Sequence, residues 1–562
     1  MTVVHYSSLP RPVTEGAFCS KDTPPSRIRG RSDRTESRAH HSASAPHSSE
    51  GSDSTSGSAP AAVPAGSTVR REGQHGGGRP VRIMVCGGDS MLGRAVNLTL
   101  GRQSPGDEEV TDTQSASFYL QLSLHRGRAA TPSSVVLFDG LDWELSEIRR
   151  NNFDGVRVWG DLLNIDMRVP PDLRLLNLET AVTETISNDD IPAKGIKYHM
   201  HSANVRAFES LAVAQHGGTE PVPYVVSVAN NHIMDFGRQA FDAETVPQLL
   251  LPAAGVAAAA GNSSGGAGSA APAEPREPPG LVGSCGLPGP GAVVGAGRNL
   301  SEASKATTVH VRGLAVRVLA FATGCAGTPQ GWAAGESRSG VAWLPPLCSW
   351  RSVRAAFATI SQAVARNGGA GGGGDAGFLI ISIHWGPNWA YRQWPDGQRY
   401  RSELAHRLVD ELGVDLIYGH SSHHVRGLET FRGKLILYGA GDLINDYEGF
   451  RNPGDEAYSC LGGVFVLDLD PGSGRVLGIR IVPTSINRLA LHRVCSNAIY
   501  WDTIRERLVR LPHAVKDLAS KINGLSVRDA RRPGQAVVLR LEKDSCNFGI
   551  TPSGSLLVWP EV

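Results

Sequence analysis

The sequence predicts an α/β protein, and two observations carry this prediction. Short β-branched apolar runs, typical of buried strands, alternate along the chain with segments of helical periodicity. Five of the runs end in side chains that can bind a metal ion: VRIMVCGGD, LRLLNLE, YVVSVANNH, GFLIISIHWG and VDLIYGHSSHH. Open α/β sheets place their sites at the carboxyl ends of parallel strands. The pattern therefore predicts a metal-centred, hydrolase-type site at the edge of a sheet.

Composition excludes several classes of protein. The 562 residues carry 55 basic and 54 acidic side chains, a net charge of +1, which gives no bulk argument for binding nucleic acid or an anionic membrane. We find no apolar run long enough to cross a membrane and no secretory signal pattern at the N-terminus. The eight cysteines form no CxxC pair, which favours a reduced, cytoplasmic setting. The Ser-, Arg- and His-rich start leaves organellar targeting open.

Three stretches have the composition of disordered chain. Residues 1–80 are rich in Ser, Pro, Gly and Arg, and order is expected from Val81 onward. Residues 258–292 are rich in Gly, Ala and Pro and are predicted to be an insertion within a folded domain. Residues 366–377 read as a glycine-rich tether, and 101–134 as a surface excursion with a short helix.

Between these stretches, the elements follow one another as strand and helix. Helices are expected at 202–214, 238–254, 352–367 and 402–413, the last ending at Gly413. A hairpin is expected around Arg312 and Gly313, and a strand at 462–470. The tail is expected to hold a helix at 501–522 and strands at 535–542 and 555–560.

The first three strand ends offer oxygen ligands and an acid. Asp89 can hold a metal, although an Asp there could instead cap the following helix. Glu179 is predicted to be the bridging or second carboxylate, with a surface loop position as the alternative. The amide of Asn231 can bind a second metal, and His232 can protonate a leaving oxygen, oriented by Asp235. A simple Asn-His helix cap is the alternative for this pair.

The last two strand ends offer histidines. His384 and His420 suit metal ligation through neutral imidazole, and His423 follows His420 closely enough to reach another metal. A lone histidine in a strand is more often a core residue, but the cluster of histidines that begins at His420 favours metal ligation instead. Five further residues are candidates for binding an anionic substrate, with a solvated surface or a plain turn as the alternative: Arg94, Lys194, His199, Asp442 and Asn445.

The chain resembles the CapA family of capsule and poly-γ-glutamate synthesis proteins. The resemblance rests on nine segments in the family's order: 87–94, 158–161, 177–183, 194–201, 228–237, 294–300, 384–389, 418–429 and 437–449. It implies a calcineurin-like metallophosphoesterase fold, two mixed β-sheets flanked by helices (αββα), over residues 81–500, with 501–562 as a helix and two short strands packed on it. It also implies a pair of divalent metal ions (Mn, Fe, Zn or Mg).

Two functions follow from the resemblance and the candidate residues. The first is metal-dependent hydrolysis of a phosphoester, in which two metal ions polarise the phosphoryl group and activate water. The second is a non-catalytic accessory role, in which the same pocket binds an acidic polymer such as polyglutamate. The metallophosphoesterase pattern usually has a histidine two residues after the first Asp, where this chain has Met91, and that favours the second function. His232, His420 and His423 favour the first.

Overall fold

The structure is a computed structural model, and the residues that it describes begin at Arg79. They are 79–104, 116–124, 155–165, 170–187, 189–213, 221–250, 287–369, 377–388, 395–426, 428–447 and 461–493, with 148, 152, 499–502, 507–510 and 556–558. Most of the predicted disordered N-terminus (all but Arg79 and Pro80), most of the predicted insertion, the strand at 535–542 and most of the tether lie outside this set. The last two residues of the predicted insertion, Gly291 and Ala292, begin a strand of the first sheet.

The first mixed sheet contains the strands that lead to Asp89, Glu179 and Asn231. Its order is β18-β17-β16-β1-β2-β5-β6, and β21 pairs with β17. The four strands β1, β2, β5 and β6 run parallel, whereas β16 to β18 are antiparallel. The bounds are β1 Val81–Ser90, β2 Leu173–Leu178, β5 Tyr224–Ser227, β6 Gly291–Val294, β16 Leu461–Leu469, β17 Val476–Asn487, β18 Ala490–Arg493 and β21 Leu556–Val558.

The second mixed sheet holds the strands that end in histidine. Its order is β11-β9-β12-β13-β15-β14, with β8 antiparallel on β9, which is the predicted hairpin. Strands β11, β9, β12, β13 and β15 are parallel to one another. The bounds are β8 Thr307–Val311, β9 Leu314–Thr323, β11 Trp343–Leu344, β12 Phe378–His384, β13 Leu416–His420, β14 Leu428–Phe431 and β15 Lys434–Leu437.

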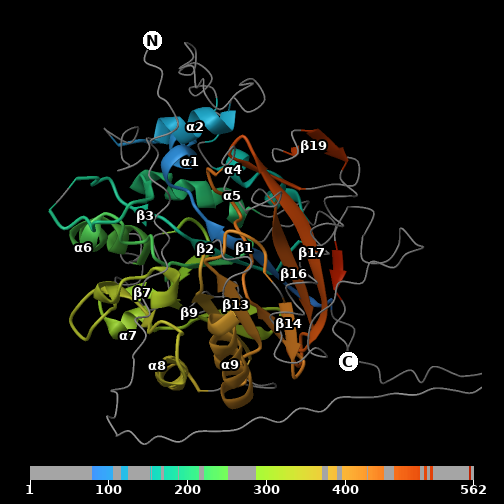
Figure 1. The fold of residues 1–562 in the computed structure, drawn as a ribbon. Helices are drawn as coiled ribbons and strands as arrows, with labels where there is room; N and C mark the ends of the chain where they lie inside the picture. The colour runs from blue at the N-terminus through green and yellow to red at the C-terminus, as the bar shows by residue number, and fades with distance from the viewer. Residues whose placement is uncertain are drawn as a thin grey trace, which may run out of the picture. The chain divides into compact units, whose positions relative to one another are not determined.

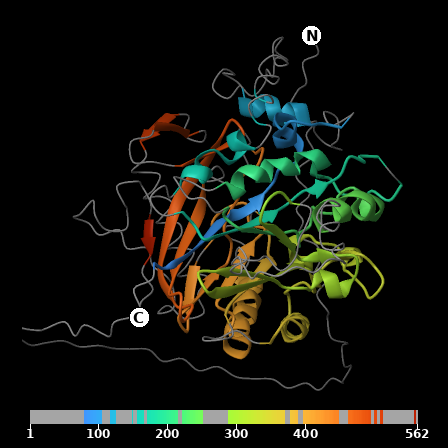
Figure 2. The same cartoon turned by 180° about the vertical axis from the view of Figure 1, so that it is seen from behind.

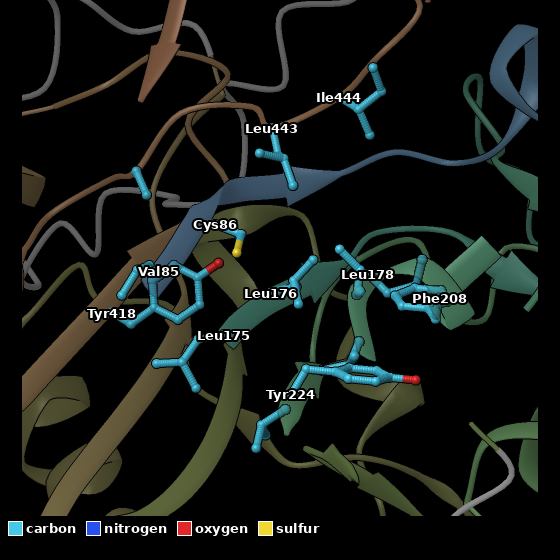
Figure 3. Packing of buried hydrophobic residues seen from close by; sticks show 14 of the residues in the cluster. Val85, Cys86, Leu175, Leu176, Leu178, Phe208, Tyr224, Tyr418, Leu443 and Ile444 are labelled. Carbon is cyan, nitrogen blue, oxygen red and sulfur yellow. The ribbon is translucent and has the colours of Figure 1, made fainter. Parts of the chain in front are cut away.

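The two sheets pack face to face through a continuous apolar core. Val85 and Leu175 from the first sheet meet Tyr418 from the second (Figure 3). Because Tyr418 is buried, its hydroxyl needs a partner, and it donates to the carbonyl of Gly87 at 2.8 Å. This hydrogen bond ties β13 to β1 just below the predicted site.

Helices cover the outer faces of both sheets, which confirms the predicted αββα layers. Helices α8 (Trp350–Arg366) and α9 (Pro395–Leu412) pack on the second sheet, and α1 (Arg94–Thr99) and α5 (Glu209–Ala212) contribute to the core beside the first (Figures 1 and 2). Helix α8 begins at a capping box between Ser349 and Ser352 and buries Val353, Ala356, Ile360 and Ala363, one stripe at helical spacing.

Short elements complete the described fold. They are α2 Ala116–Leu124, α4 Val156–Trp159, α6 Gly237–Ala240 and α7 Leu300–Ala303, the 3-10 turns η2 Gly160–Asn164, η3 Ser202–Phe208, η5 Gly324–Ala326 and η6 Gln330–Trp332, and the strand pairs β3 Ala181–Val182 with β4 His199–Met200, β7 Ala296–Gly297 with β10 Gly340–Val341, and β19 Ile499–Asp502 with β20 Arg507–Arg510. Among the described residues, no helix combines the length and apolar character needed to cross a membrane.

Three expected helices differ from the structure. Within the helix expected at 202–214, Ser202–Phe208 form a 3-10 turn that leads into the short α5, Glu209–Ala212. Residues 241–250 form a π-helix (η4, Phe241–Leu250) that contains Pro247, whose missing N–H cannot complete the regular helical ladder. The helix expected from Trp501 was wrong at its start, because 499–502 and 507–510 pair as an antiparallel hairpin. Ile499, Tyr500, Trp501 and Val509 in these two segments are aromatic and β-branched residues, which favour strands.

Candidate metal centre

The predicted ligands meet because parallel strands of both sheets end at the same place. Asp89 is paired in register with Asn177 of β2, and His384 with His420 on adjacent strands of the second sheet. Of the residues predicted to bind metal, all six are buried: Asp89, Glu179, Asn231, His384, His420 and His423. Two groups of three bring one ligand atom each to within 4.8 Å of one another, namely Asp89 with His384 and His420, and Asp89 with His423 and Asp442.

Asp89 lies at the centre of these ligands. Its Oδ1 accepts a hydrogen bond from the Asn177 amide at 2.9 Å and lies 3.7 Å from Nδ1 of His420. Helix α1 is capped by Gly93, so Asp89 does not serve as the helix cap that the sequence left open. Burial, together with the neighbouring Asp442 carboxylate, raises the pKa of Asp89 to about 6.

The two strand-end histidines are held as neutral imidazoles. Nδ1 of His384 lies 2.9 Å from Nδ1 of His420, and Nε2 of His384 lies 3.0 Å from the Asn231 side-chain oxygen. Ser382 contacts the other nitrogen of His420 at 2.8 Å. Burial lowers the pKa of His420 to about 3 and that of His384 well below its usual value. The neutral form is the one that binds metal.

Glu179 carries an orphaned buried oxygen. Its Oε1 lies 3.6 Å from Nε2 of His384, whereas Oε2 is buried without a hydrogen-bond partner. Burial and the adjacent Asp89 carboxylate hold its pKa well above the usual range. An unsatisfied buried carboxylate oxygen is costly, and a divalent cation would satisfy it. The donor set of carboxylate, amide and imidazole therefore fits the metal ions that the sequence predicts.

The turn after β5 divides its tasks among adjacent residues. Asn230 accepts hydrogen bonds from the backbone N–H groups of His232 and Ile233, both at 3.0 Å, and so closes a turn. The next helix, α6, begins at Gly237 with Phe236 as its N-cap residue, so Asn231 and His232 are not its cap. Asn231 is thereby left to face His384, and His232 to face Glu179, with Nε2 at 3.9 Å from Oε1.

Asp235 and Lys194 contact the inner side of His232. Nδ1 of His232 lies 2.5 Å from Asp235 Oδ2, and Lys194 Nζ donates to the other oxygen of Asp235 at 2.8 Å. The Tyr198 backbone N–H donates to the same carboxylate at 2.7 Å. Burial, with Lys194 adding to it, lowers the pKa of His232 to about 4, whereas His232 and Lys194 hold the pKa of Asp235 below its usual value despite its burial.

Asp442 and Asn445, predicted to contact substrate, surround His423. Nδ1 of His423 lies 2.9 and 3.1 Å from the two oxygens of Asp442, and Asn445 donates to that carboxylate at 2.5 Å. Burial alone lowers the pKa of His423, but Asp442 and Asp89 outweigh it and raise the pKa above its usual value.

Arg94 and His199, also predicted to contact substrate, lie in enclosed positions. The Arg94 guanidinium forms a buried bidentate ion pair with Asp446, one bond of 3.0 Å, and packs against the ring of Tyr119 at 3.7 Å. His199 lies 2.6 Å from the Thr183 carbonyl through Nε2 and packs on Phe236. Both side chains are therefore engaged within the protein.

Sequence reasoning gave Asp442 a substrate role and did not group it with the ligands. Yet the segment LYGAGD, which ends at Asp442, repeats the pattern of VCGGD, which ends at Asp89: a strand, then glycines, then Asp. That repetition was the signal available. Tyr198 and Tyr447, whose hydroxyls hydrogen-bond to each other beside Arg94, carried no such pattern.

Comparison with known proteins defines the family. The chain matches the family described as "Bacterial capsule synthesis protein PGA_cap" over residues 83–261 and 292–447. It belongs to this capsule synthesis family, as the resemblance to CapA indicated. It is 32% identical over 431 residues to a "Probable polyglutamine synthesis accessory protein" of Mycobacterium tuberculosis, covering 76% of this chain and 90% of that protein. It is 26% identical over 166 residues to "PGA biosynthesis protein CapA" of Bacillus subtilis, covering 29% and 37%.

Proposed function

We propose that the chain is a metal-dependent phosphoester hydrolase within the capsule synthesis family. The observation that carries this proposal is the position of His232. Its Nε2 faces the ligand cluster, while its Nδ1 is held by Asp235 at 2.5 Å. A histidine that only capped a helix would not need a buried carboxylate behind it, and here the next helix, α6, begins at Gly237 with Phe236 as its N-cap residue.

The residues of the chain supply binding, orientation and proton transfer. The residues that would hold divalent ions are Asp89, Glu179, Asn231, His384, His420 and His423, and such ions would supply Lewis-acid polarisation of a phosphoryl oxygen. As water attacks phosphorus and the ester P–O bond breaks, Nε2 of His232 gives its proton to the leaving oxygen. Asp235 holds the ring by accepting from Nδ1–H and stabilises the charged imidazole. An anionic substrate favours the protonated imidazole against the effect of burial.

Lys194 contacts both His232 and Asp235 and holds this pair of side chains in place. Its ammonium contacts Asp235, the Asn231 backbone carbonyl and Nδ1 of His232. Its side chain is 17% exposed, and we infer that an approaching anion meets it there. We assign it both to positioning and to attraction of the substrate's charge.

The test compares two adjacent substitutions in purified protein loaded with Mn²⁺. His232→Ala should retain its metal and lose about 10²–10⁴-fold in kcat on a phosphoester panel, because it removes the acid and no ligand. Asn231→Ala should weaken metal binding and hydrolysis together. His310→Ala, an exposed histidine on β8, is the matched control. Equal effects of the first two substitutions on metal content and rate would overturn the role of His232.

A non-catalytic accessory role is the second candidate. It is favoured by the similarity to the mycobacterial relative, which is named as an accessory protein of polyglutamine synthesis. In that case the wild type would show no chelator-sensitive hydrolysis on the panel and would bind polyglutamate in the same pocket. Isothermal titration with polyglutamate, with and without Lys194→Met, separates this role from hydrolysis.

A further inference from the structure

The segment after β15 is fastened to the end of β1 on both sides of Asp442. The Gly441 carbonyl accepts from the N–H groups of Gly88 at 2.5 Å and Asp89 at 3.2 Å, and the Leu443 N–H donates to the Asp89 carbonyl at 2.8 Å. A Cβ at Gly88 would lie 2.4 Å from the Gly441 oxygen, and Gly441 itself has φ +76°, so both positions require glycine. The backbone therefore fixes Asp442 relative to Asp89.

The side chains around Asp442 converge on one point. One ligand atom each from Asp89, His423 and Asp442 lies within 4.8 Å of the others, and the exposed fractions of the residues are 0%, 3% and 4%. The Asn445 amide orients the Asp442 carboxylate from the outside. One imidazole and two carboxylates form a ligand set suited to Mn²⁺.

The buried carboxylates around Asp442 also favour a bound cation. Asp89, Glu179 and Asp442 bring three carboxylates into one buried region, and Oε2 of Glu179 has no hydrogen-bond partner. Arg94 is already paired with Asp446 and Lys194 with Asp235, and His423, at 2.9 Å from Asp442, can balance one of the three charges. Buried carboxylates without paired cations are strongly unfavourable, so a divalent ion between them would remove the imbalance.

The position two residues after Asp89, just past the end of β1, supplies no ligand. Met91 is fully buried, and its N–H is used by the Ile444 carbonyl at 2.9 Å. We propose that Asp442 is a direct metal ligand, that it completes a second site with Asp89 and His423, and that Asp89 is the carboxylate shared with the site of His384 and His420. Glu179 then belongs to one site only. This inference rests on the metal binding in the proposed function and is independent of hydrolysis.

The substitution Asp442→Asn distinguishes two roles for Asp442: a direct metal ligand, or a residue that only orients His423. Asparagine keeps an oxygen that can accept from His423 and removes the negative charge. If Asp442 is a ligand, Mn²⁺ stoichiometry falls from two to one, and the magnetic coupling of the pair disappears from the Mn²⁺ EPR spectrum. If Asp442 only orients His423, two ions remain bound. Asp415→Asn, which removes a buried carboxylate elsewhere on the second sheet, is the matched control and should keep two ions.

Two further variants test the shared carboxylate. Asp89→Asn should lose both Mn²⁺ ions, whereas Glu179→Gln should keep the ion held by Asp442. The reverse result would overturn the assignment of Asp89. His423→Gln should lose the same single ion as Asp442→Asn, which keeps the test decisive if Asp442→Asn does not fold. A wild type that binds one ion, lost in His384→Ala, would refute the second site and leave the metal of the proposed function intact.

Discussion

Oδ1 of Asp89 lies 3.7 Å from Nδ1 of His420, although Asp89 ends a strand of the first sheet and His420 a strand of the second. The candidate centre is thus built across the seam between the two sheets. Tyr418, two residues before His420, bonds the Gly87 carbonyl just below the centre. The packing of the two sheets therefore controls the geometry of the ligands.

The paired histidines of the second sheet should be essential for metal binding. His384→Ala with His420→Ala removes two ligands from the group that contains Asp89, and each lost ligand removes a direct bond. Purified protein should lose bound metal, measured by inductively coupled plasma mass spectrometry. The double variant His310→Ala with His492→Ala changes two exposed histidines and should retain it. Full metal content in the first variant would contradict the site.

Charge at Asp89 should make the stability of the metal-free protein depend on pH. Its folded pKa, about 6, lies above the usual value, so the neutral carboxylic acid is fully tolerated below about pH 4, and stability is lost as the pH rises through 6 and the buried group ionises. In chelator, Asp89→Asn should be more stable than wild type at pH 7.5, by at most about 3 kcal/mol. That advantage should vanish as the pH falls to 4, as measured by urea denaturation.

Asp235 provides the control of opposite sign. Its folded pKa is lowered, so its carboxylate stabilises the fold above its unfolded pKa and loses that contribution as the pH falls. Asp235→Asn should therefore be less stable than wild type at pH 7.5, and the difference should shrink on acidification. Parallel pH profiles for the two Asn variants would show that burial does not act on Asp89 as described.

Breaking the buried pair of Arg94 and Asp446 should destabilise the fold. Asp446→Ala leaves an enclosed guanidinium without its counter-charge and should cost about 3–5 kcal/mol in urea denaturation. Replacing both residues by apolar side chains, as in Arg94→Met with Asp446→Leu, should cost less than Asp446→Ala alone. A cost below about 1 kcal/mol for Asp446→Ala would place this pair in solvent rather than in the interior.

Limited proteolysis should cut first within 1–80 and 258–292 and leave the remaining fragments associated. Neither stretch has the apolar content to pack a core. Most of both stretches lies outside the described residues, so composition carries this prediction. The cuts can be located by mass spectrometry of early fragments. Resistance of the 258–292 segment would mean that it packs against the domain or binds a partner.

Local sequence pattern is enough to predict the fold class and the strands that end in candidate ligands. The run FLIISIH, which ends at His384, is buried at every residue. Its continuous apolar and β-branched character can be recognised from neighbouring residues, without tertiary contacts. The capping box of α8 and the hairpin at Arg312 are local in the same way. Where local signals conflict, as at Pro247 or in the 501–510 hairpin, sequence reasoning misplaced the element.

The grouping of polar residues into one site depends on tertiary contacts between distant segments. Arg94 and Asp446 stand 352 positions apart, and nothing in either local pattern shows that one neutralises the other. Asp442 reaches Asp89 because backbone bonds fasten two distant segments, so a residue that read as a turn became a candidate ligand. Strand periodicity is a property of neighbours in sequence, whereas ligand sets and ion pairs depend on the order in which strands assemble into sheets. That order becomes definite only when the two sheets pack.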